Sequence, residues 1–307
     1  MGEKPVVRIG HLRAVDHLAL GIAAFGPLAW GRELEYLFLE PVSMNGWHQV
    51  LERLCDKGID GAFLPAPAAI DLISAGADVK ILLQGARSGA GLVKRLGANI
   101  KTMADFKGRT VLVPHELSIH TLLVHRVMAS VGLEAGTAVT ADVVLESMAP
   151  AMMAEAMEYD REGRIGGFIA PEPFVSLAVE SGVGTMVCES ETLWPGHPSS
   201  VFVLRDAVIN AWPDAVFELV KNFVNPGMRP NDLVAAAVSF LGQDPGVVEK
   251  MIGKQVVGRA GACSLPDIET LGIIHDYMQE ALGRVGCETG VGGCLELSFA
   301  RKAGVVR

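Results

Sequence analysis

Residues able to hold a ligand gather in the segments that follow apolar, strand-like runs of this chain. Ser, Arg and His donate hydrogen bonds to an anion, whereas Asp and Glu accept hydrogen bonds or a proton. The candidate ligand-binding residues are Asp16, His17, Pro65, Arg87, His115, Ser118, His120, Glu172 and His197. No nucleophile stands beside a base in a known motif, so we assign no catalytic residue and expect these side chains to contact a ligand.

Ser118 stands at a predicted helix start, which makes it a candidate N-cap. The first turn of a helix offers free N–H groups and a partial positive charge, and both favour an anion. Asp16 is placed in the same way before a helix that begins near His17. Two interpretations stay open for both residues: a helix cap alone, or a cap beside a bound ligand.

Arg87 and Glu172 lie in loops that follow strand-like runs. Arg87 is the candidate cation for the charged group of an anionic ligand. Glu172 then orients Arg87 or accepts a proton from the ligand. Alternatively, the two residues form an ion pair between two lobes.

The histidines do not form a zinc-binding motif. His115 and His120 are five residues apart, which places them about 140° apart around a helix rather than on one face. His120 and His125 have the same spacing. We therefore expect histidine donors to a ligand and no metal.

Motifs for nucleotide cofactors are also missing. Gly85, Gly89 and Gly91 do not follow the Gly-x-Gly-x-x-Gly spacing, and no Gly-Lys-Ser/Thr follows them. We expect no cofactor.

Apolar runs alternate with amphipathic stretches along the first two thirds of the chain. This alternation predicts parallel α/β sheets with helices on both faces. The expected strands are 6–12, 36–39, 61–64, 79–83, 110–113, 142–145, 167–170 and 201–204. The expected helices are 17–25, 68–75, 120–131 and 151–159, with another that Ser43 caps. After Leu204 the pattern becomes mostly helical, at 212–224, 232–241, 245–252 and 267–282.

Two strand-like segments repeat each other at a constant offset of 106 residues. Ile59 to Pro67 and Ile165 to Pro173 share Ile, Gly, Pro and Pro at matching positions. The repeat predicts two α/β lobes whose Pro-x-Pro segments lie at the carboxyl ends of strands, where doubly wound sheets bind ligands. We expect lobe one at 1–88 plus 200–307 and lobe two at 89–199, with hinges at 89–91 and 187–193.

Composition limits the kind of partner. The chain has 307 residues and a formal net charge of -9, which argues against a general nucleic-acid binder. No apolar run is long enough to span a membrane, and the first residues have no signal-peptide core. The five cysteines predict free thiols, or a single bridge between Cys287 and Cys294.

The chain resembles the solute-binding proteins of ABC transporters of the nitrate/sulfonate/taurine type, which include thiamine-precursor-binding relatives. The resemblance runs from about Val7 to Val224, with a weaker echo in 298–303. It rests on the order and spacing of Ile9-Gly10, Asp16-His17-Leu18, Asp60-Gly61-Ala62-Phe63, Gly108-Arg109-Thr110-Val111, Pro114-His115, Ser118 to Leu123, Gly167-Phe168, Glu172-Pro173-Phe174 and Trp194-Pro195. Pro171 departs from it, because relatives often have Gly there.

This resemblance implies a periplasmic-binding-protein type II fold with two lobes around a ligand cleft and a helical C-terminal tail. It implies capture of a small anionic solute by lobe closure and delivery to the permease subunits of an ABC importer. A monomer in the periplasm is expected, with the cytoplasm as the alternative. The alternative function is an enzyme or a ligand sensor on the same fold that acts on a small organic acid.

Overall fold

The computed structural model describes residues 4–30, 34–226, 230–253, 262–284, 286–287 and 290–305. The chain forms two compact units. The first consists of Met1–Met44, His48–Arg87 and Pro198–Arg307, and the second of Asn45–Trp47 and Ser88–His197. The main chain therefore passes between the units at Arg87–Ser88 and at His197–Pro198, and also on either side of the short segment Asn45–Trp47. That the lobes fold as separate domains with the expected boundaries stays a prediction.

The first unit contains a five-stranded sheet in the order β2-β1-β3-β11-β4. Its strands are β1 (Val6–His11), β2 (Phe38–Ser43), β3 (Gly61–Leu64), β4 (Val79–Gln84) and β11 (Val201–Arg205). β1 pairs in parallel with β2 and β3, whereas β11 runs antiparallel to both β3 and β4. One strand is thus inserted against the direction of the others.

The second unit repeats this arrangement in a six-stranded sheet with the order β10-β5-β9-β6-β8-β7. Its strands are β5 (Ala90–Arg95), β6 (Arg109–Val113), β7 (Ala135–Gly136), β8 (Val143–Ser147), β9 (Ile165–Pro171) and β10 (Gly184–Glu189). β6, β7, β8 and β9 are parallel, and β5 runs antiparallel to β9 and β10. β5 therefore takes the place that β11 takes in the first unit.

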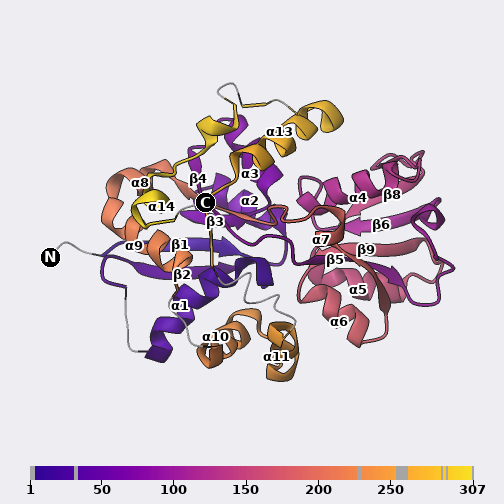
Figure 1. The fold of residues 1–307 in the computed structure, drawn as a ribbon, viewed down its shortest axis with the longest axis horizontal. Coiled ribbons are helices and arrows are strands. Elements are labelled where there is room, and N and C mark those ends of the chain that lie inside the picture. The colour runs from indigo at the N-terminus through magenta and orange to yellow at the C-terminus, as the bar shows by residue number, and fades with distance from the viewer. Residues whose placement is uncertain are drawn as a thin grey trace. The chain divides into compact units, whose positions relative to one another are not determined.

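Helices cover both faces of the first sheet (Figure 1). They are η1 (Val15–His17), α1 (Leu18–Trp30), α2 (Trp47–Cys55), α3 (Ala66–Ser74), α8 (Asp206–Ala211), α9 (Pro213–Val224), α10 (Pro230–Leu241), α11 (Pro245–Gly253), α13 (Ile268–Leu282), η3 (Val291–Cys294) and α14 (Ser298–Lys302). Fully buried Phe63 and Phe202 of the sheet pack with Phe223 of α9 in one apolar core, which α1 and α10 complete. The helical tail after β11 thus builds the core of the first unit.

The second sheet has a separate apolar core on each face. Its helices are η2 (Met103–Phe106), α4 (Ile119–Ala129), α5 (Pro150–Tyr159), α6 (Phe174–Glu180) and α7 (Ser190–Leu193). Leu123 and Met128 of α4 pack on one face, whereas Met153 of α5 and Val175 of α6 pack on the other. Figure 1 shows α4 on one side of the strands and α5 and α6 on the opposite side. The sheet is therefore doubly wound, as the sequence predicts.

Glycine at matching positions of the repeat lets the inserted strand approach. A Cβ added at Gly61 would lie closer than 3.0 Å to the Val203 carbonyl oxygen of β11, and one added at Gly167 equally close to the Val93 carbonyl oxygen of β5. Side-chain carbons essentially never come that near a backbone oxygen. The glycines that define the 106-residue offset thus stand where each parallel strand meets its antiparallel neighbour.

Most expected strands and helices are confirmed, and the strand 61–64 coincides with β3. Two expectations are wrong. Ser43 caps no helix, because it is the last residue of β2, pairs with His11, and precedes α2 by several residues. The hinges expected at 89–91 and 187–193, which lie largely in β5, β10 and α7, stay a prediction. The sheets are mixed rather than wholly parallel.

Two further observations concern membrane and thiol chemistry. Among the described residues, no helix combines the length and the apolar character that a membrane span requires. The five cysteines are unbridged, and Cys263 and Cys294 are buried.

The close approach at Gly167 generates a stability prediction. Gly167→Ala should destabilise the chain by about 2 kcal/mol, because the new Cβ forces β5 and β9 apart. Gly272→Ala is the matched control, since a Cβ at that position of α13 meets nothing within 4 Å and helix propensity favours Ala by about 1 kcal/mol. Urea unfolding measures both variants, and a Gly167→Ala protein as stable as wild type would contradict the packing.

Candidate binding sites at the strand ends

The carboxyl ends of β1, β3 and β4 lead to four of the predicted residues. Asp16 and His17 lie in η1 after β1, Pro65 follows β3 as the N-cap residue of α3, and Arg87 follows β4. Because β11 is antiparallel, its first residue Val201 pairs with Leu64 and Gln84 at the ends of β3 and β4. The start of β11 therefore brings Ser199 and Ser200 to the same edge.

Asp16 is fixed at this edge by the two serines. Ser199 Oγ donates to the Asp16 carboxylate, and Ser200 Oγ donates to the Asp16 carbonyl oxygen at 3.0 Å. The Ala86 amide donates to Ser200 Oγ at 3.3 Å. Asp16 is not the N-cap, because that position of η1 belongs to Ala14. The carboxylate is buried and joins β1 to the start of β11.

His17 is a wholly buried neutral histidine. Its Nδ1 accepts a hydrogen bond from the Leu12 amide at 3.0 Å, and its ring lies 5.5 Å from that of Phe63. Burial, with the positive potential of His11 second, lowers its pKa to about 3. His17 therefore holds the turn after β1 without carrying charge at neutral pH.

Arg87 is exposed and lines a pocket of about 590 Å³ within the first unit. Arg301 of α14 and the segment that leads into α13 supply much of the remaining wall. Although burial works against it, hydrogen bonds from Thr270 and Glu269 and the charge of Arg87 lower the pKa of Asp267. The pocket thus combines a guanidinium with a carboxylate that already caps α13.

The second sheet brings another group of polar residues to its carboxyl edge. His115, Ser118 and His120 follow β6, and Glu172 follows β9. Ala90 at the start of β5 pairs with Pro171 at the end of β9, so Ser88 reaches this edge as Ser199 does in the first unit. The two units present chemically similar edges.

The first turn of α4 is held by a hydroxyl network. Ser118 is the N-cap, as the sequence predicts, and its Oγ accepts the Thr121 amide at 3.2 Å. Thr121 Oγ1 donates to the His115 carbonyl oxygen at 2.7 Å, and His115 Nδ1 accepts the Leu117 amide at 3.0 Å. These bonds fix the loop that leads into α4.

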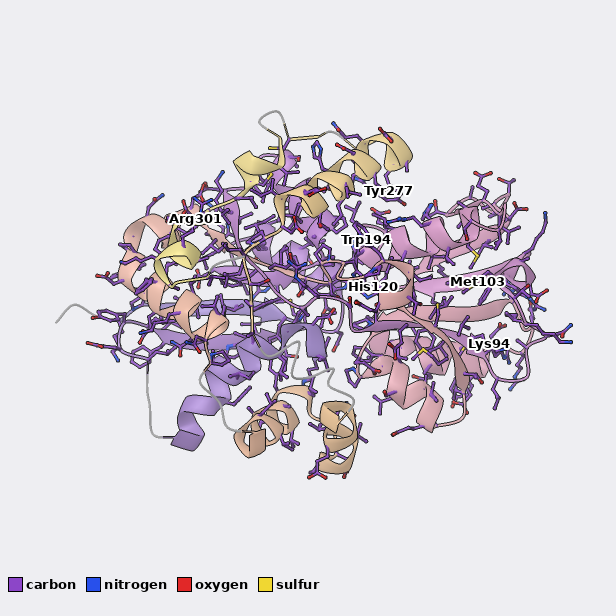
Figure 2. All side chains as sticks on the ribbon, in the orientation of Figure 1. Lys94, Met103, His120, Trp194, Tyr277 and Arg301 are labelled. Atoms are coloured by element: carbon purple, nitrogen blue, oxygen red, sulfur yellow. The ribbon has the colours of Figure 1, made fainter. Side chains whose placement is uncertain are left out.

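His120 has no hydrogen-bond partner for either ring nitrogen among the described residues, although both nitrogens are buried. It occupies the second position of α4, where Figure 2 labels it. Burial, and after it the neighbouring His197, lowers its pKa to about 3. An unsatisfied buried donor or acceptor costs about 1–3 kcal/mol, so an additional partner for this imidazole would be stabilising.

His197 and Glu172 complete the edge. His197 is buried, its carbonyl oxygen accepts the Ser88 amide at 3.0 Å, and its ring lies 6.5 Å from Trp194. Both Glu172 carboxylate oxygens accept hydrogen bonds from Ser176, one from the amide at 3.0 Å and one from the hydroxyl at 2.9 Å. Glu172 thus stabilises the start of α6, and its pairing with Arg87 stays a prediction.

The nine predicted residues fall into two groups, one at each sheet edge. The first contains Asp16, His17, Pro65 and Arg87, and the second contains His115, Ser118, His120, Glu172 and His197. Sequence reasoning missed Ser199, Ser200, Thr121 and Ser176, which hold these residues in place. The available signal was the pair Ser199-Ser200 directly before β11. This signal could be used only if the antiparallel direction of β11 was already known. Among the described residues, no three His, Cys, Asp or Glu side chains form a metal site.

Residues 1–236 match the model of the NMT1-like family. The chain is 26% identical over 236 residues to the nitrate import ATP-binding protein NrtC of Synechocystis, covering 71% of this chain and 34% of that protein. It is 25% identical over 223 residues to the bicarbonate transport ATP-binding protein CmpC of Synechococcus elongatus, and this match covers 65% of this chain and 33% of CmpC. The chain thus spans about a third of the length of these relatives.

Solved structures share the fold over nearly the whole chain. A ligand-binding component of an ABC-type import system from Staphylococcus aureus has a TM-score of 0.80 at 20% identity and covers 98% of this chain and 99% of its own. The periplasmic nitrate-binding protein NrtA of Synechocystis has a TM-score of 0.75 at 16% identity, with 98% and 89% covered. The alkanesulfonate-binding protein SsuA of Xanthomonas axonopodis has a TM-score of 0.73 at 18% identity, and the match covers 97% of this chain and 100% of SsuA.

The buried histidines predict how stability depends on pH. The pKa values of His17 and His120 are lowered to about 3 in the folded chain, from an ordinary value of 6.5. Between these values the unfolded chain binds more protons, so stability is greatest above about pH 6.5 and falls as the pH decreases. Each histidine should account for about 2 kcal/mol of loss by about pH 5.

Urea unfolding at pH 7 and pH 5 measures this loss. His120→Gln should lose about 2 kcal/mol less than wild type between the two pH values. The exposed His48→Gln is the matched control and should lose as much as wild type. Equal losses in all three proteins would show that His120 is protonated when folded.

Proposed function

The chain belongs to the NMT1-like family, and from this we propose that it is the solute-binding component of an ABC importer. The fold it shares with NrtA and SsuA supports this proposal, because those proteins are described as nitrate-binding and alkanesulfonate-binding. We propose the same kind of task here: reversible capture of a small solute and its delivery to a permease.

His120 carries the proposal. Both of its nitrogens are buried and lack a partner in the described chain, at the start of an eleven-residue helix. Ser118 already accepts the Thr121 amide, whereas the geometry of a helix leaves the amides of Ile119 and His120 without an acceptor inside α4. A solute oxygen at this position would accept these amides and a proton of the His120 ring.

The proposed solute is a small anion. Its charge suits the positive end of α4 and the donors at the second edge, which are hydroxyl, amide and imidazole groups. The names of similar proteins support a small anion: two relatives are named for nitrate and bicarbonate transport, and one structural neighbour is named for alkanesulfonate binding. Arg87 is the proposed cation for the anionic group, as the sequence analysis expects.

The partners and the location follow from the same proposal. NrtC and CmpC are named as ATP-binding proteins of transport systems, and we propose that this chain acts with permease subunits of such a system. Several neighbours are described as periplasmic, which supports an extracytoplasmic location. We propose that the chain acts as a monomer.

A binding protein returns its solute chemically unchanged. The alternative, an enzyme on the same fold, would convert it. Incubation of the chain with each candidate anion, followed by mass spectrometry of the recovered anion, therefore separates the two. We expect the anion to be recovered unchanged.

Truncation of His120 tests the site. His120→Ala should weaken binding of the best anion from a panel of nitrate, bicarbonate and short alkanesulfonates by about 10- to 100-fold, since a hydrogen bond to a charged group contributes about 1.5–3 kcal/mol. His125→Ala, from a half-buried histidine on the same helix, is the matched control and should bind like wild type. Isothermal titration calorimetry gives the Kd values, and equal affinity in wild type and His120→Ala would remove His120 from the site.

Arg87→Ala tests the proposed cation. If Arg87 binds the solute, binding should fall below detection while the Tm of the ligand-free protein stays within about 1 °C of wild type, because the side chain is exposed. Arg284→Ala controls for loss of a positive charge elsewhere in the first unit. Binding that is only modestly weaker in Arg87→Ala would favour the ion-pair interpretation instead.

A further inference from the structure

Two segments of the C-terminal tail are bound to β4 and form walls of the pocket that Arg87 lines. Gln84, the last residue of β4, and Ser264 exchange both of their backbone hydrogen bonds at 2.9 Å. The Glu296 amide donates to the Ile81 carbonyl oxygen at 2.9 Å, which fixes the segment that leads into α14. One strand therefore holds both walls, so the pocket is part of the folded first unit.

The size of this pocket does not match the proposed solute. Its volume of about 590 Å³ lies within the range of about 300–1,000 Å³ that is typical of small-molecule sites. Nitrate and bicarbonate have only a few non-hydrogen atoms and would fill a small part of it. Every residue that lines the pocket belongs to the first unit, whereas His120 belongs to the second. The pocket therefore suits a second and larger ligand.

The pocket contains two strong hydrogen-bond donors. Arg87 and Arg301 line it, and both side chains are exposed. The Asp267 carboxylate accepts the Glu269 and Thr270 amides at 3.1 and 3.3 Å and the Thr270 hydroxyl at 3.0 Å. These three bonds use that carboxylate to cap α13. A guanidinium has five N–H donors, so it can bind a ligand in addition to a protein partner.

Gln84 adds a buried donor beside the same wall. Its side chain is almost fully buried, and its Oε1 accepts the Asp267 amide at 3.4 Å. The oxygen must face Asp267, because an amide N–H requires an acceptor. The Gln84 Nε2 group is buried without a hydrogen-bond partner in the part of the chain that the structure describes. An acceptor that a ligand supplies beside Asp267 would satisfy this donor.

The remaining walls of the pocket are apolar. Leu265, Pro266, Ile268 and Leu297 line it, and Ile268 is 50% exposed although its side chain is large and apolar. The formal charges of the lining residues cancel, since Asp267 and Glu269 balance the two arginines. This balance leaves no excess of positive charge for a dianion. A ligand with one negative charge and an apolar body fits both features.

We propose that this pocket reversibly binds an organic monocarboxylate with an apolar body, such as a medium-chain or aryl acid. The carboxylate binds the guanidiniums of Arg301 and Arg87, and the body packs against Leu265, Ile268 and Leu297. This assignment goes beyond the proposed solute site and requires no residue of the second unit. Because Arg87 is also the proposed cation for the solute, the experiment uses Arg301 instead.

Matched ligands separate the charged group from the apolar body. Hexanoate and phenylacetate are titrated into the full chain by isothermal titration calorimetry. Hexanamide keeps the body of hexanoate without its charge, and acetate keeps the charge without most of the body. Both should bind at least about 10-fold more weakly than hexanoate, since each lacks one of the two sets of contacts.

Matched variants locate the binding in the pocket. Arg301→Gln should weaken hexanoate binding by about 10-fold or more. Lys302→Gln removes the neighbouring charge of α14, whose ammonium lies 4.3 Å from the centre of the Phe217 ring, and should bind like wild type. Ile268→Ala should weaken binding by about 3- to 10-fold. Ile273→Ala is its control, because Ile273 is 49% exposed on the same helix and does not line the pocket.

Three results would overturn the proposal. The first is that neither hexanoate nor phenylacetate binds. The second is that hexanamide binds as tightly as hexanoate, which would show that no charge is recognised. The third is that Arg301→Gln binds hexanoate like wild type, or that His120→Ala abolishes its binding, either of which would place hexanoate elsewhere. Failure of nitrate, bicarbonate and alkanesulfonates to bind would contradict the proposed function and leave the hexanoate result unaffected.

Discussion

The backbone pairing of one antiparallel strand in each sheet is the contact on which the rest of the structure depends. β11 lies between β3 and β4, and β5 lies between β9 and β10. Each of these strands begins shortly after the chain has come from the other unit. Neither sheet is complete until that strand is in place, so the first unit cannot finish folding until the chain has left it and returned, whereas the strands of the second unit all lie within the continuous segment Ser88–His197.

The same pairing positions the candidate sites. A parallel strand brings only its carboxyl end to the ligand-binding edge, whereas an antiparallel strand brings its amino end. Ser199 and Ser88 therefore reach the edges from segments that a purely parallel sheet would direct to the opposite side. Each meets a carboxylate there, Asp16 in the first unit and Glu191 in the second. The acidic groups at the edges are thus used to hold the loops.

Sequence periodicity was sufficient for most of the fold, including the run at 201–204 that forms β11, but it did not predict β5 or the antiparallel direction of either inserted strand. The repeat at Gly61 and Gly167 was visible, because glycine at the same position of two apolar strands is unusual. Its cause was not visible, since the carbonyl oxygens of Val203 and Val93 come from distant segments. β5 and β10 were missed for a related reason: they contain Gly91 and Gly184, and glycine without a partner strand in view favours a turn.

The site residues also divide into those whose role could be predicted from the local sequence and those whose partners could not. Ser118 was predictable because an N-cap depends only on local sequence, and its bond to the Thr121 amide is local. The partners of Asp16 and Glu172 were not predictable to the same degree. Asp16 bonds to Ser199, which is far away in sequence, whereas Glu172 bonds to Ser176 only four residues later. The Glu172–Ser176 contact could have been predicted as a contact in the first turn of α6. The start of that helix was not recognised in the sequence, because Pro173 stands directly before it.

A helix cap and a ligand at the start of α4 are compatible rather than alternative interpretations. Ser118 accepts a single amide, that of the third helical residue, and the Leu122 amide bonds to the Ser118 carbonyl oxygen at 3.3 Å. The amides of the first two helical residues, Ile119 and His120, point beyond the helix end by its geometry. The His120 ring, buried beside them, has two further polar atoms without partners in the described chain. The cap therefore stabilises the helix while leaving free those donors that a small anion requires.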